Sequence, residues 1–417
     1  MIWLKNLNET QIDPVVIGDI SINSLLYADD IILLSSTESG LQKSLDELNK
    51  FCSSWKLDVN KEKSKVMIFN SNGKTHLNYF KINDVHIETV KTYCYLGITL
   101  KYNGNINVST KLLMEKGRKA WFKIKKTIGL DNACNFLEKL FDTLVSPIIL
   151  YGSEVWGAYC NFRDSDPFEY LHLKFIKEIL GIHSKATNVA CLAELNRFPL
   201  KDKIKLLSLK FWDHISNSTN TLVNKIYKNL PTNNRWVTTI KEWTQKLGFG
   251  YLVNNSGNIK NTLGIIKQRI YDQNLQHQQS SINESNKLSF FRNVYKPNQR
   301  PPYVDICRFK SDRSNICKYR ISAHSLEIER GRHRNIPHNN RKCTKCKSDQ
   351  IEDEVHFFMH CPIYNTYRQE LCLKLNNIYR NFNSLTKNKI FFLLNNNSLV
   401  ALKAVIEYIN KCICLVK

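Results

Sequence analysis

The feature that most constrains the fold is a pair of adjacent aspartates between two apolar segments. Leu25-Leu26-Tyr27 precedes Ala28-Asp29-Asp30, and Ile31-Ile32-Leu33-Leu34 follows. Short apolar segments on either side of a turn signal predict a β-hairpin. Ionised carboxylates beside apolar strands are unfavourable unless a cation or hydrogen bonds compensate them. One interpretation is a Mg²⁺ site completed by phosphate oxygens, and the other is an exposed Asp-Asp turn.

The segments that follow predict an α+β fold. Residues 38–55 have helical spacing, with apolar Leu41, Leu45 and Leu48 on one side. Two β-rich stretches follow, 66–69 and 93–100, separated by the Asn72-Gly73 turn and a ribbon around 80–87. Strands, a helix and further strands in this order are typical of an α+β domain.

The rest of the chain is expected to be mainly helical. Helical periodicity runs from about residue 109 to 230, with a kink or boundary at Pro147. Residues 231–300 are rich in Asn, Gln and Ser and predict linkers between short helices, while Ser398 is an N-cap candidate for a final helix. The predicted regions are 1–104, 105–230, 231–302, 303–368 and 369–417.

Composition and charge favour a polyanionic partner. The 60 Lys and Arg residues exceed the 37 Asp and Glu residues, which gives a net charge of +23. Nucleic acid is the first expectation, and a solvated basic surface is the alternative. The 13 cysteines follow no signal peptide, and no apolar run approaches the roughly 20 residues of a membrane span. We therefore expect an intracellular protein, nuclear or cytoplasmic and not secreted, with reduced thiols and no membrane contact.

Several segments resemble those of one enzyme family. Leu25 to Leu33 resembles the Tyr-x-Asp-Asp palm loop of reverse transcriptases. Leu57 to Ser64 is similar to the family's Asn-x-x-Lys-Ser/Thr segment, and Tyr95-Leu96-Gly97 to its primer-grip turn. Val145 to Gly157 and Ala193 to Leu200 are similar to thumb segments of non-LTR (LINE-type) retrotransposon enzymes. The whole resembles the carboxy-terminal portion of such a reverse transcriptase.

The resemblance implies a site, its cofactor and its substrates. Asp29 would be the principal Mg²⁺ ligand, Asp30 its weaker neighbour, and Lys63 would face the nucleotide phosphates, although a solvated lysine is equally compatible with the sequence. The implied partners are an RNA template, a DNA primer or target and dNTPs. The residues expected near the primer and substrate are Tyr27, Tyr95, Leu96 and Gly97.

The resemblance also implies that part of the polymerase site is missing. Only 26 residues precede Tyr27, which is too few for an upstream aspartate strand and fingers. We therefore expect a truncated palm followed by a helical thumb and linker region and a small zinc module. The polymerase would be inactive alone, and the alternative is a polymerase-dead remnant that binds nucleic acid through its basic thumb and zinc module.

A basic segment lies in the region similar to a thumb. Six cations surround Trp121 and Phe122, an interleaving that suits a nucleic-acid backbone. A helix with a solvated basic face and buried aromatics is the alternative. The six are Lys116, Arg118, Lys119, Lys123, Lys125 and Lys126.

Near the carboxy terminus, cysteine and histidine have metal-ligand spacing. Cys343 and Cys346, His356 and Cys361 form a Cys-x2-Cys-x9-His-x4-Cys pattern, which suits structural, tetrahedral Zn²⁺. His360 could replace His356, but its adjacency to Cys361 makes joint ligation awkward.

The sequence before and around this pattern is strongly basic. Residues 310–347 contain eleven Lys or Arg and three acids, a density that suits phosphate contacts. Together with Cys361-Pro362-Ile363-Tyr364, this stretch resembles the carboxy-terminal zinc region of LINE-type polyproteins. The expected phosphate-binding residues here are Arg330, Arg332, Arg334 and Arg341.

Overall fold

The chain forms two compact units built from alternating segments. The computed structural model describes residues 12–70, 79–160, 162–163, 165–218, 221–254, 262–346, 348–380 and 382–415. Unit 1 contains Met1–Leu113, Gly152–Asn161 and Ile204–Ile266, and unit 2 contains Met114–Tyr151, Phe162–Lys203 and Lys267–Lys417. Three helices pass from one unit into the other: α3 (Asn107–Ile128), α9 (Leu200–Asn217) and α13 (Leu263–Glu284).

The strands of unit 1 form four separate antiparallel pairs within the described residues. Each pair is a short hairpin, so the predicted β-rich character is confirmed, but these strands do not join into one sheet. The pairs are β1 (Val15–Ile17) with β2 (Ile20–Ile22), β3 (Ser24–Tyr27) with β4 (Asp30–Leu33), β5 (Phe80–Ile82) with β6 (Val85–Ile87), and β7 (Thr92–Tyr95) with β8 (Ile98–Lys101).

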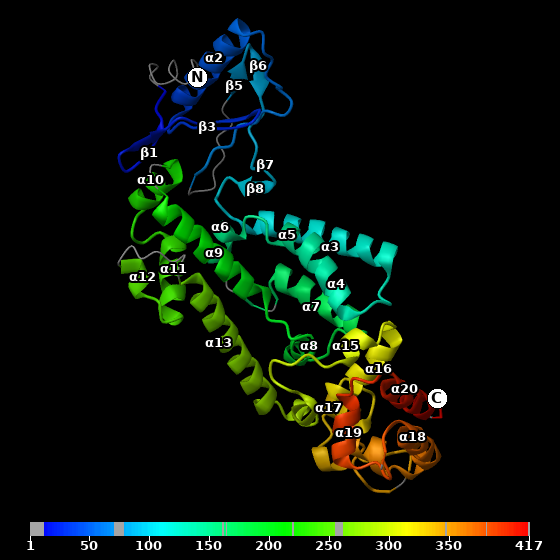
Figure 1. Ribbon diagram of the computed structural model, residues 1–417. Helices are drawn as coiled ribbons and strands as arrows, with labels where there is room; N and C mark the ends of the chain where they lie inside the picture. The colour runs from blue at the N-terminus through cyan, green and yellow to red at the C-terminus, as the bar shows by residue number, and fades with distance from the viewer. Residues whose placement is uncertain are drawn as a thin grey trace. The chain divides into compact units, whose positions relative to one another are not determined.

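Helix α2 (Glu38–Ser54) organises the first core of unit 1. It begins at Thr37, whose Oγ1 accepts a hydrogen bond from the Gly40 amide at 3.0 Å and so satisfies one of the amides left open at a helix start. Its buried Leu45 packs with residues of β5 and β6, which lie beside it in Figure 1. The predicted helix and its apolar side are confirmed. The core comprises Leu45, Val66, Phe80, Ile82 and Ile87.

The predicted strand at residues 66–69 is wrong. Val66 makes one isolated parallel bridge with Thr89, and the three residues after it have no regular secondary structure. Val66 is apolar and buried because it packs in the α2 core, so burial explains the apolar signal without a strand. The predicted Asn72-Gly73 turn lies outside the described residues.

The remaining part of unit 1 is helical. Two side chains of α11 (Arg235–Lys246) donate hydrogen bonds to backbone carbonyls in and just after α6 (Ser153–Trp156). Trp236 Nε1 donates to Glu154 O at 3.1 Å, and Thr239 Oγ1 donates to Ala158 O at 3.2 Å. These bonds fix α11 to the segment after residue 152. The elements are α6 (Ser153–Trp156), η2 (Gly157–Tyr159), α10 (Leu222–Asn229), α11 (Arg235–Lys246) and α12 (Tyr251–Asn254), with most of α9.

Unit 2 is mainly helical, and its described residues include an isolated antiparallel bridge between Lys342 and Ile351. It contains most of α3 and α13 and the following elements: α4 (Cys134–Leu140), η1 (Phe141–Val145), α5 (Ser146–Ile149), α7 (Pro167–Leu180), α8 (Asn188–Glu194), η4 (Asn286–Leu288), α14 (Phe291–Val294), α15 (Tyr303–Ile306), α16 (Lys310–Arg320), α17 (Glu327–His333), η5 (His338–Asn340), η6 (His356–His360), η7 (Pro362–Tyr364), α18 (Asn365–Ile378), α19 (Lys387–Leu394) and α20 (Leu399–Cys414).

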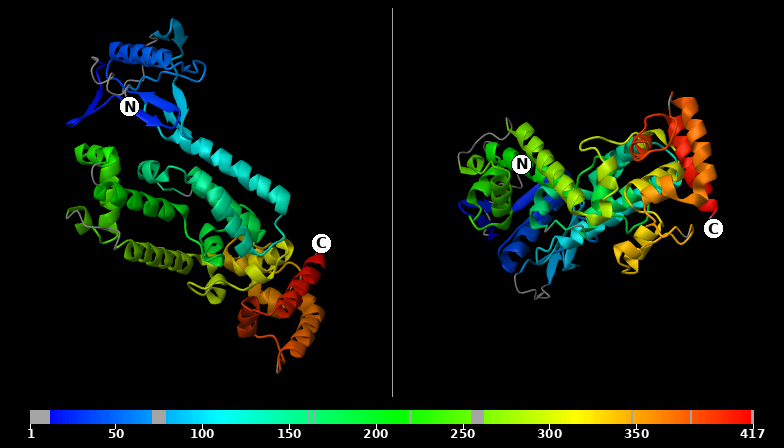
Figure 2. Two further views of the ribbon diagram at one scale, coloured as in Figure 1. Left: turned by 45° about the horizontal axis from the view of Figure 1, so that its top comes forward. Right: turned by 90° about the horizontal axis from the view of Figure 1, so that it is seen from below.

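An aromatic core seats the long helix α3, which Figure 2 shows along its length. The Trp121 ring meets the Phe175 ring edge-on at 4.9 Å, and Phe141 stacks on Phe175 at 4.1 Å. Gly117 of α3 lies against Ile149 of α5. A Cβ at position 117 would be only 2.2 Å from Ile149 Cγ2. This close approach requires glycine and fixes α3 against the segment that contains α5.

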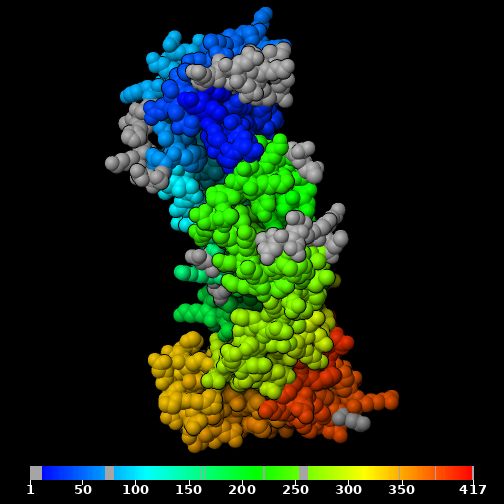
Figure 3. Space-filling view, turned by 90° about the vertical axis from the view of Figure 1, so that its left-hand side faces the viewer, coloured from blue at the N-terminus to red at the C-terminus, as the bar shows by residue number. Residues whose placement is uncertain are grey.

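The carboxy-terminal helices pack on the cysteine-bearing segment. Tyr408 of α20 donates its hydroxyl hydrogen bond to Phe357 O at 2.8 Å, and its ring packs near those of Phe357 and Phe358. In the space-filling view, the orange and red segments that carry the carboxy-terminal helices lie against each other (Figure 3). The predicted N-cap is confirmed, because Ser398 Oγ accepts from the Ala401 amide at 3.4 Å.

Residues 231–302 are more helical than the sequence indicated. They contain α11 and the 22-residue α13, which includes Gln278-Gln279-Ser280-Ser281. Glutamine forms helices well, and buried Ile266, Ile270 and Ile282 supply the apolar side. Polar composition alone therefore misled the prediction of linkers. The five-region division of the chain stays a prediction.

None of the described helices is by itself long and apolar enough to cross a membrane. Helices α19 and α20 reach that length and composition only as a pair, with a bend of 114° between them.

Candidate active-site hairpin and nucleic-acid surfaces

The adjacent aspartates lie at the tip of the β3–β4 hairpin, as the sequence predicted. Tyr27 pairs with Asp30 across the strands, and Ala28 turns the chain with a φ of 50°. Asp29, Asp30 and the Tyr27 side chain are all exposed. The expected penalty for ionised carboxylates beside apolar strands therefore does not apply, because both side chains are exposed to solvent.

An exposed pair of carboxylates has the donor chemistry for a hard cation but not a full set of ligands. Mg²⁺ usually keeps water and phosphate oxygens alongside one or two carboxylates, so the pair fits such an ion together with a phosphate-bearing substrate. Within the described residues, Asp29 and Asp30 are not part of any cluster of three or more ligating side chains.

Lys63 projects from an ordered turn. Asn60 Oδ1 accepts from the Lys63 amide at 3.0 Å, and Ser64 Oγ donates to Asn60 O at 2.8 Å. The Tyr93 hydroxyl of β7 donates to Lys63 O at 3.2 Å, so the turn is held against the β7–β8 hairpin while the Lys63 side chain remains exposed. The Asn-x-x-Lys-Ser pattern thus has a local structural role through its Asn and Ser.

Leu96 and Gly97 form the two-residue turn between β7 and β8. Both have a positive φ, 46° and 83°, and Tyr95 pairs with Ile98 across them. This turn matches the twist of a hairpin, but a leucine in the left-handed region is uncommon and strained. The residues predicted from the sequence thus lie at the tip of the β3–β4 hairpin, at the tip of the β7–β8 hairpin and in the turn at Lys63. The hydrogen bond from Tyr93 to Lys63 O connects the β7–β8 hairpin with the Lys63 turn.

Comparison with known proteins agrees with these hairpins and turns. Residues 3–100 match the family described as reverse transcriptase (RNA-dependent DNA polymerase). The chain is 28% identical over 167 residues to a putative uncharacterized transposon-derived protein of Caenorhabditis elegans, covering 39% of this chain and 58% of that protein. It is 24% identical over 211 residues to the RNA-directed DNA polymerase from mobile element jockey of Drosophila melanogaster, covering 48% of this chain and 22% of that enzyme.

These matches support a likeness to the reverse transcriptases of non-LTR retrotransposons, which is direct for residues 3–100. The resemblance drawn from its motifs is confirmed. The chain spans less than two thirds of each of these two relatives, 58% of the worm protein and 22% of the fly polymerase.

Helix α3 has a basic exposed face. Lys116, Lys119, Lys123 and Lys126 follow spacings of three and four residues and are all exposed, so they share one face. Arg118 and Phe122 lie beside this row, and the Phe122 side chain is 63% exposed. None of the five cations makes an ion pair among the described residues, so their charges face solvent.

Lys125 differs from the other predicted cations. Its Nζ lies 2.8 Å from Glu178 Oε2, an atom that also accepts from Trp121 Nε1 at 2.8 Å. It therefore lies on the packed side of α3, where it is bound to α7. The sequence could not show that Lys125 is paired while Lys126 is exposed, because Glu178, the partner of Lys125, is distant in the chain.

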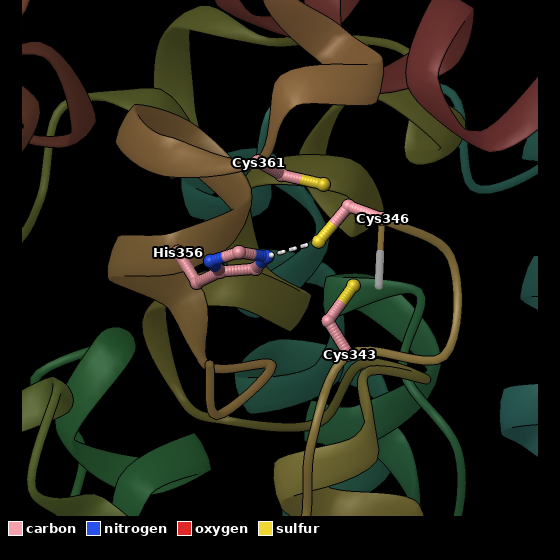
Figure 4. Close-up of side chains that lie close together, drawn as sticks. All are labelled: Cys343, Cys346, His356 and Cys361. Atoms are coloured by element: carbon pink, nitrogen blue, oxygen red, sulfur yellow. Dashed lines mark hydrogen bonds between the residues drawn. The ribbon is translucent and has the colours of Figure 1, made fainter. Parts of the chain in front are cut away.

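The cysteine and histidine side chains converge in unit 2, as Figure 4 shows. One ligand atom from each of Cys343, Cys346, His356 and Cys361 lies within 4.8 Å of every other. Cys346 Sγ is 3.4 Å from His356 Nε2, and the other ring nitrogen, Nδ1, is 2.9 Å from Gln350 Oε1. His360 is exposed and outside the cluster, so the structure brings in His356, as preferred from the sequence.

The donor set fits a thiophilic metal ion. Burial raises the pKa of the Cys361 thiol to about 12, and burial also raises the pKa of Cys343. Burial opposes ionisation of Cys346 as well, but hydrogen bonds with Ser348 lower its pKa overall. A bound cation would favour the thiolate forms that these buried groups otherwise resist.

Buried acids anchor this cluster to the preceding segment. Glu352 Oε2 accepts from the Glu327 amide at 2.8 Å, and Glu354 Oε1 accepts from Ser322 Oγ at 2.5 Å. His324 Nε2 also lies 3.0 Å from Glu354 Oε1. The described residues of 321–364 therefore form one module around the cluster, which we call the zinc module after the ion that its four ligands would hold.

The four arginines expected to bind phosphate have partners within this module. Arg332 pairs with Glu329 at 2.9 Å, Arg330 and Arg334 both pair with Glu327, and Arg341 donates to the carbonyls of Ile336 and Ile328. Arg341 thus has a structural role, and two buried glutamates offset the charge of the other three arginines.

A second charged network, which the sequence did not reveal, links Arg197 of the segment Ala193 to Leu200 with Glu138 and Asp142, which precede Val145. Arg197 binds both carboxylate oxygens of Asp142, at 2.8 and 2.9 Å, and Glu138 joins Arg197 to Arg300. Burial would raise the pKa of Asp142, but its hydrogen bonds from Arg197 hold the pKa below the usual value. The residue types were visible in the sequence, whereas their pairing across the helices was not.

Proposed function

We propose that this chain is the palm end, thumb and zinc-binding tail of an RNA-directed DNA polymerase that copies the RNA of a non-LTR retrotransposon at a DNA primer or target. The match of residues 3–100 to the reverse transcriptase family carries this proposal. The partners would be an RNA template, a DNA end and dNTPs, inside the cell in the nucleus or cytoplasm.

In this proposal Asp29 and Asp30 would hold Mg²⁺. The ion would neutralise phosphate charge and lower the pKa of the attacking hydroxyl. Lys63, whose side chain is exposed on a fixed turn, would add a cation for the leaving phosphates. Tyr27 and the 95–97 turn would position the primer end, and the α3 basic face would bind the backbone of the template and primer.

We further propose that residues 1–417 bind nucleic acid but do not polymerise alone. The observation behind this second candidate function is the hairpin itself, where Asp29 and Asp30 have no third ligating side chain among the described residues. The zinc module, by contrast, supplies four ligands from its own segment. Zn²⁺ would act there as a structural ion.

Binding of a template–primer by this polypeptide tests the first proposal. Replacing both Lys119 and Lys123 with alanine should weaken binding and reduce the slope of log affinity against log salt by about 1 to 2. The control is Lys125→Ala on the same helix, which removes a cation that is paired with Glu178. Equal affinity and slope for the double variant and the wild-type protein would reject the α3 surface.

Primer extension by the same polypeptide tests the second proposal. We expect no templated dNTP incorporation with Mg²⁺ present. Incorporation that Asp29→Ala abolishes, and that Asp19→Ala at the neighbouring exposed β1–β2 turn preserves, would instead make these residues a complete polymerase.

A further inference from the structure

A short segment between α15 and α16 exposes an arginine and a phenylalanine. Arg308 is exposed, and the Phe309 side chain is 61% exposed, although Cys307 just before it is buried. Together the two side chains present an aromatic ring and a positive charge to solvent at one place on the surface. The pair did not enter the sequence-based expectations.

Buried Arg313 holds this segment against the end of α3. Its guanidinium donates to Cys307 O at 2.9 Å and Arg308 O at 2.5 Å on one side, and to Leu130 O and Asn132 O, both at 2.6 Å, on the other. The Lys310 amide donates to Asp131 Oδ1 at 2.7 Å. All these residues belong to unit 2, so 307–310 is fixed beside the residues that directly follow α3.

The exposed cations of α3 extend along the helix to Lys126, near its carboxy-terminal end at Ile128. At about 1.5 Å per residue, Lys116 to Lys126 spans roughly 15 Å, with Phe122 beside the row. The chain then passes through residues 129–132, which Arg313 and Lys310 bind. One exposed aromatic, Phe122, thus lies among the cations of the helix, and the segment with Arg308 and Phe309 is held beside the residues that follow the helix.

We infer that Arg308 and Phe309 are an additional binding site for single-stranded nucleic acid that continues the α3 surface. Cations along a path suit the phosphate backbone, and exposed aromatic rings offer stacking partners for bases. A duplex hides the faces of its bases, so two exposed rings favour an unpaired strand. This inference rests on the proposed function, because it extends the α3 surface that the template–primer experiment tests.

Fluorescence anisotropy with a labelled, unstructured oligouridylate and the full chain tests the inference. Phe309→Ala should weaken binding about five- to tenfold, within the range for loss of one base stack. Arg308→Ala should lower the salt slope by about 0.7, the value for one phosphate of a single strand. Binding of a duplex should change little in Phe309→Ala.

Matched variants elsewhere in unit 2 serve as controls. Phe392→Ala removes another exposed phenylalanine, and Arg380→Ala another exposed arginine; both should bind like the wild type. Equal zinc content and thermal midpoints would show that each variant is folded.

The outcomes separate this inference from the proposed function. If the Lys119 and Lys123 double variant loses affinity while Phe309→Ala and Arg308→Ala match their controls, the inference is overturned and the proposed α3 surface stands. If duplex binding falls as much as oligouridylate binding, the assignment to a single strand is overturned. Selective loss of oligouridylate binding in Phe309→Ala, with a lower salt slope in Arg308→Ala, supports it.

Discussion

The β3–β4 hairpin and the zinc module differ in how far each completes its own site. The hairpin lies within the family match, yet its two aspartates are exposed and, as the proposed magnesium ligands, would need a substrate or further groups to complete the coordination of the ion. The zinc module lies outside that match, yet four ligand atoms converge within 4.8 Å and buried acids support them. The function of the hairpin is therefore supported by similarity to a family, whereas the function of the zinc module is supported by the arrangement of its own side chains.

The largest effect is expected from loss of the metal in the zinc module. Cys346→Ser, or chelation of the wild-type protein, should release zinc and unfold residues 321–364, since zinc binding to such modules contributes on the order of 10 kcal/mol. Metal content and limited proteolysis measure this. His360→Ala should leave both unchanged, because His360 is outside the cluster. Wild-type preparations that contain no zinc and yet resist proteolysis in the module would break the comparison.

The next effect concerns the ion pair of Arg320 and Glu194, whose side chains are 1% and 0% exposed. Glu194→Ala should destabilise unit 2 by about 3–5 kcal/mol, because it leaves a buried guanidinium without its carboxylate. Thermal unfolding measures the loss. The control is Glu407→Gln, which breaks an exposed pair with Lys374 and should change stability by less than about 1 kcal/mol. Equal midpoints for the two variants would contradict the packing described for Glu194.

A smaller, pH-dependent effect is expected at Asp142. Its pKa is held below the usual value in the folded protein, so its contribution to stability is present above the unfolded pKa of about 3.9 and is lost as the pH falls further. Asp142→Asn should therefore lower the urea midpoint at neutral pH, and the difference from wild type should shrink below about pH 4. A difference that is constant from pH 7 to pH 3 would argue against the Arg197 pair.

The smallest effect on stability is expected at the hairpin. Asp29→Ala and Asp30→Ala should each change the free energy of unfolding by less than about 0.5 kcal/mol, because both side chains are exposed. Denaturant unfolding tests this. A loss above about 1.5 kcal/mol would show that the acids support the fold, and the contrast with the zinc module would disappear.

Local patterns predicted the local structure well. The apolar segments around Asp29 and Asp30 predicted a hairpin, the spacing after Thr37 predicted α2, and Ser398 begins α20. The four zinc-module ligands were also predictable, because the pattern that binds metal is contained in a short segment.

Features that depend on distant partners could not be predicted. Lys125 lies on the packed side of α3 because Glu178 is there, and Arg313 binds carbonyls of residues 130 and 132 that are far away in sequence. Apolar Val66 is buried without a strand because α2 and β5 cover it. The exposure of Phe309 likewise follows from the packing around Arg313.

The glycine contact of α3 has a consequence for movement of a bound strand. Gly117 lets α3 pack closely against Ile149, and this contact favours one orientation of the helix and therefore of its row of lysines. In the proposed function, a strand lying along that row would meet a similar charge at each helical turn, so neighbouring positions along the row would be nearly equal in energy. Such a surface would hold a strand and leave only a low barrier to translocation by one step.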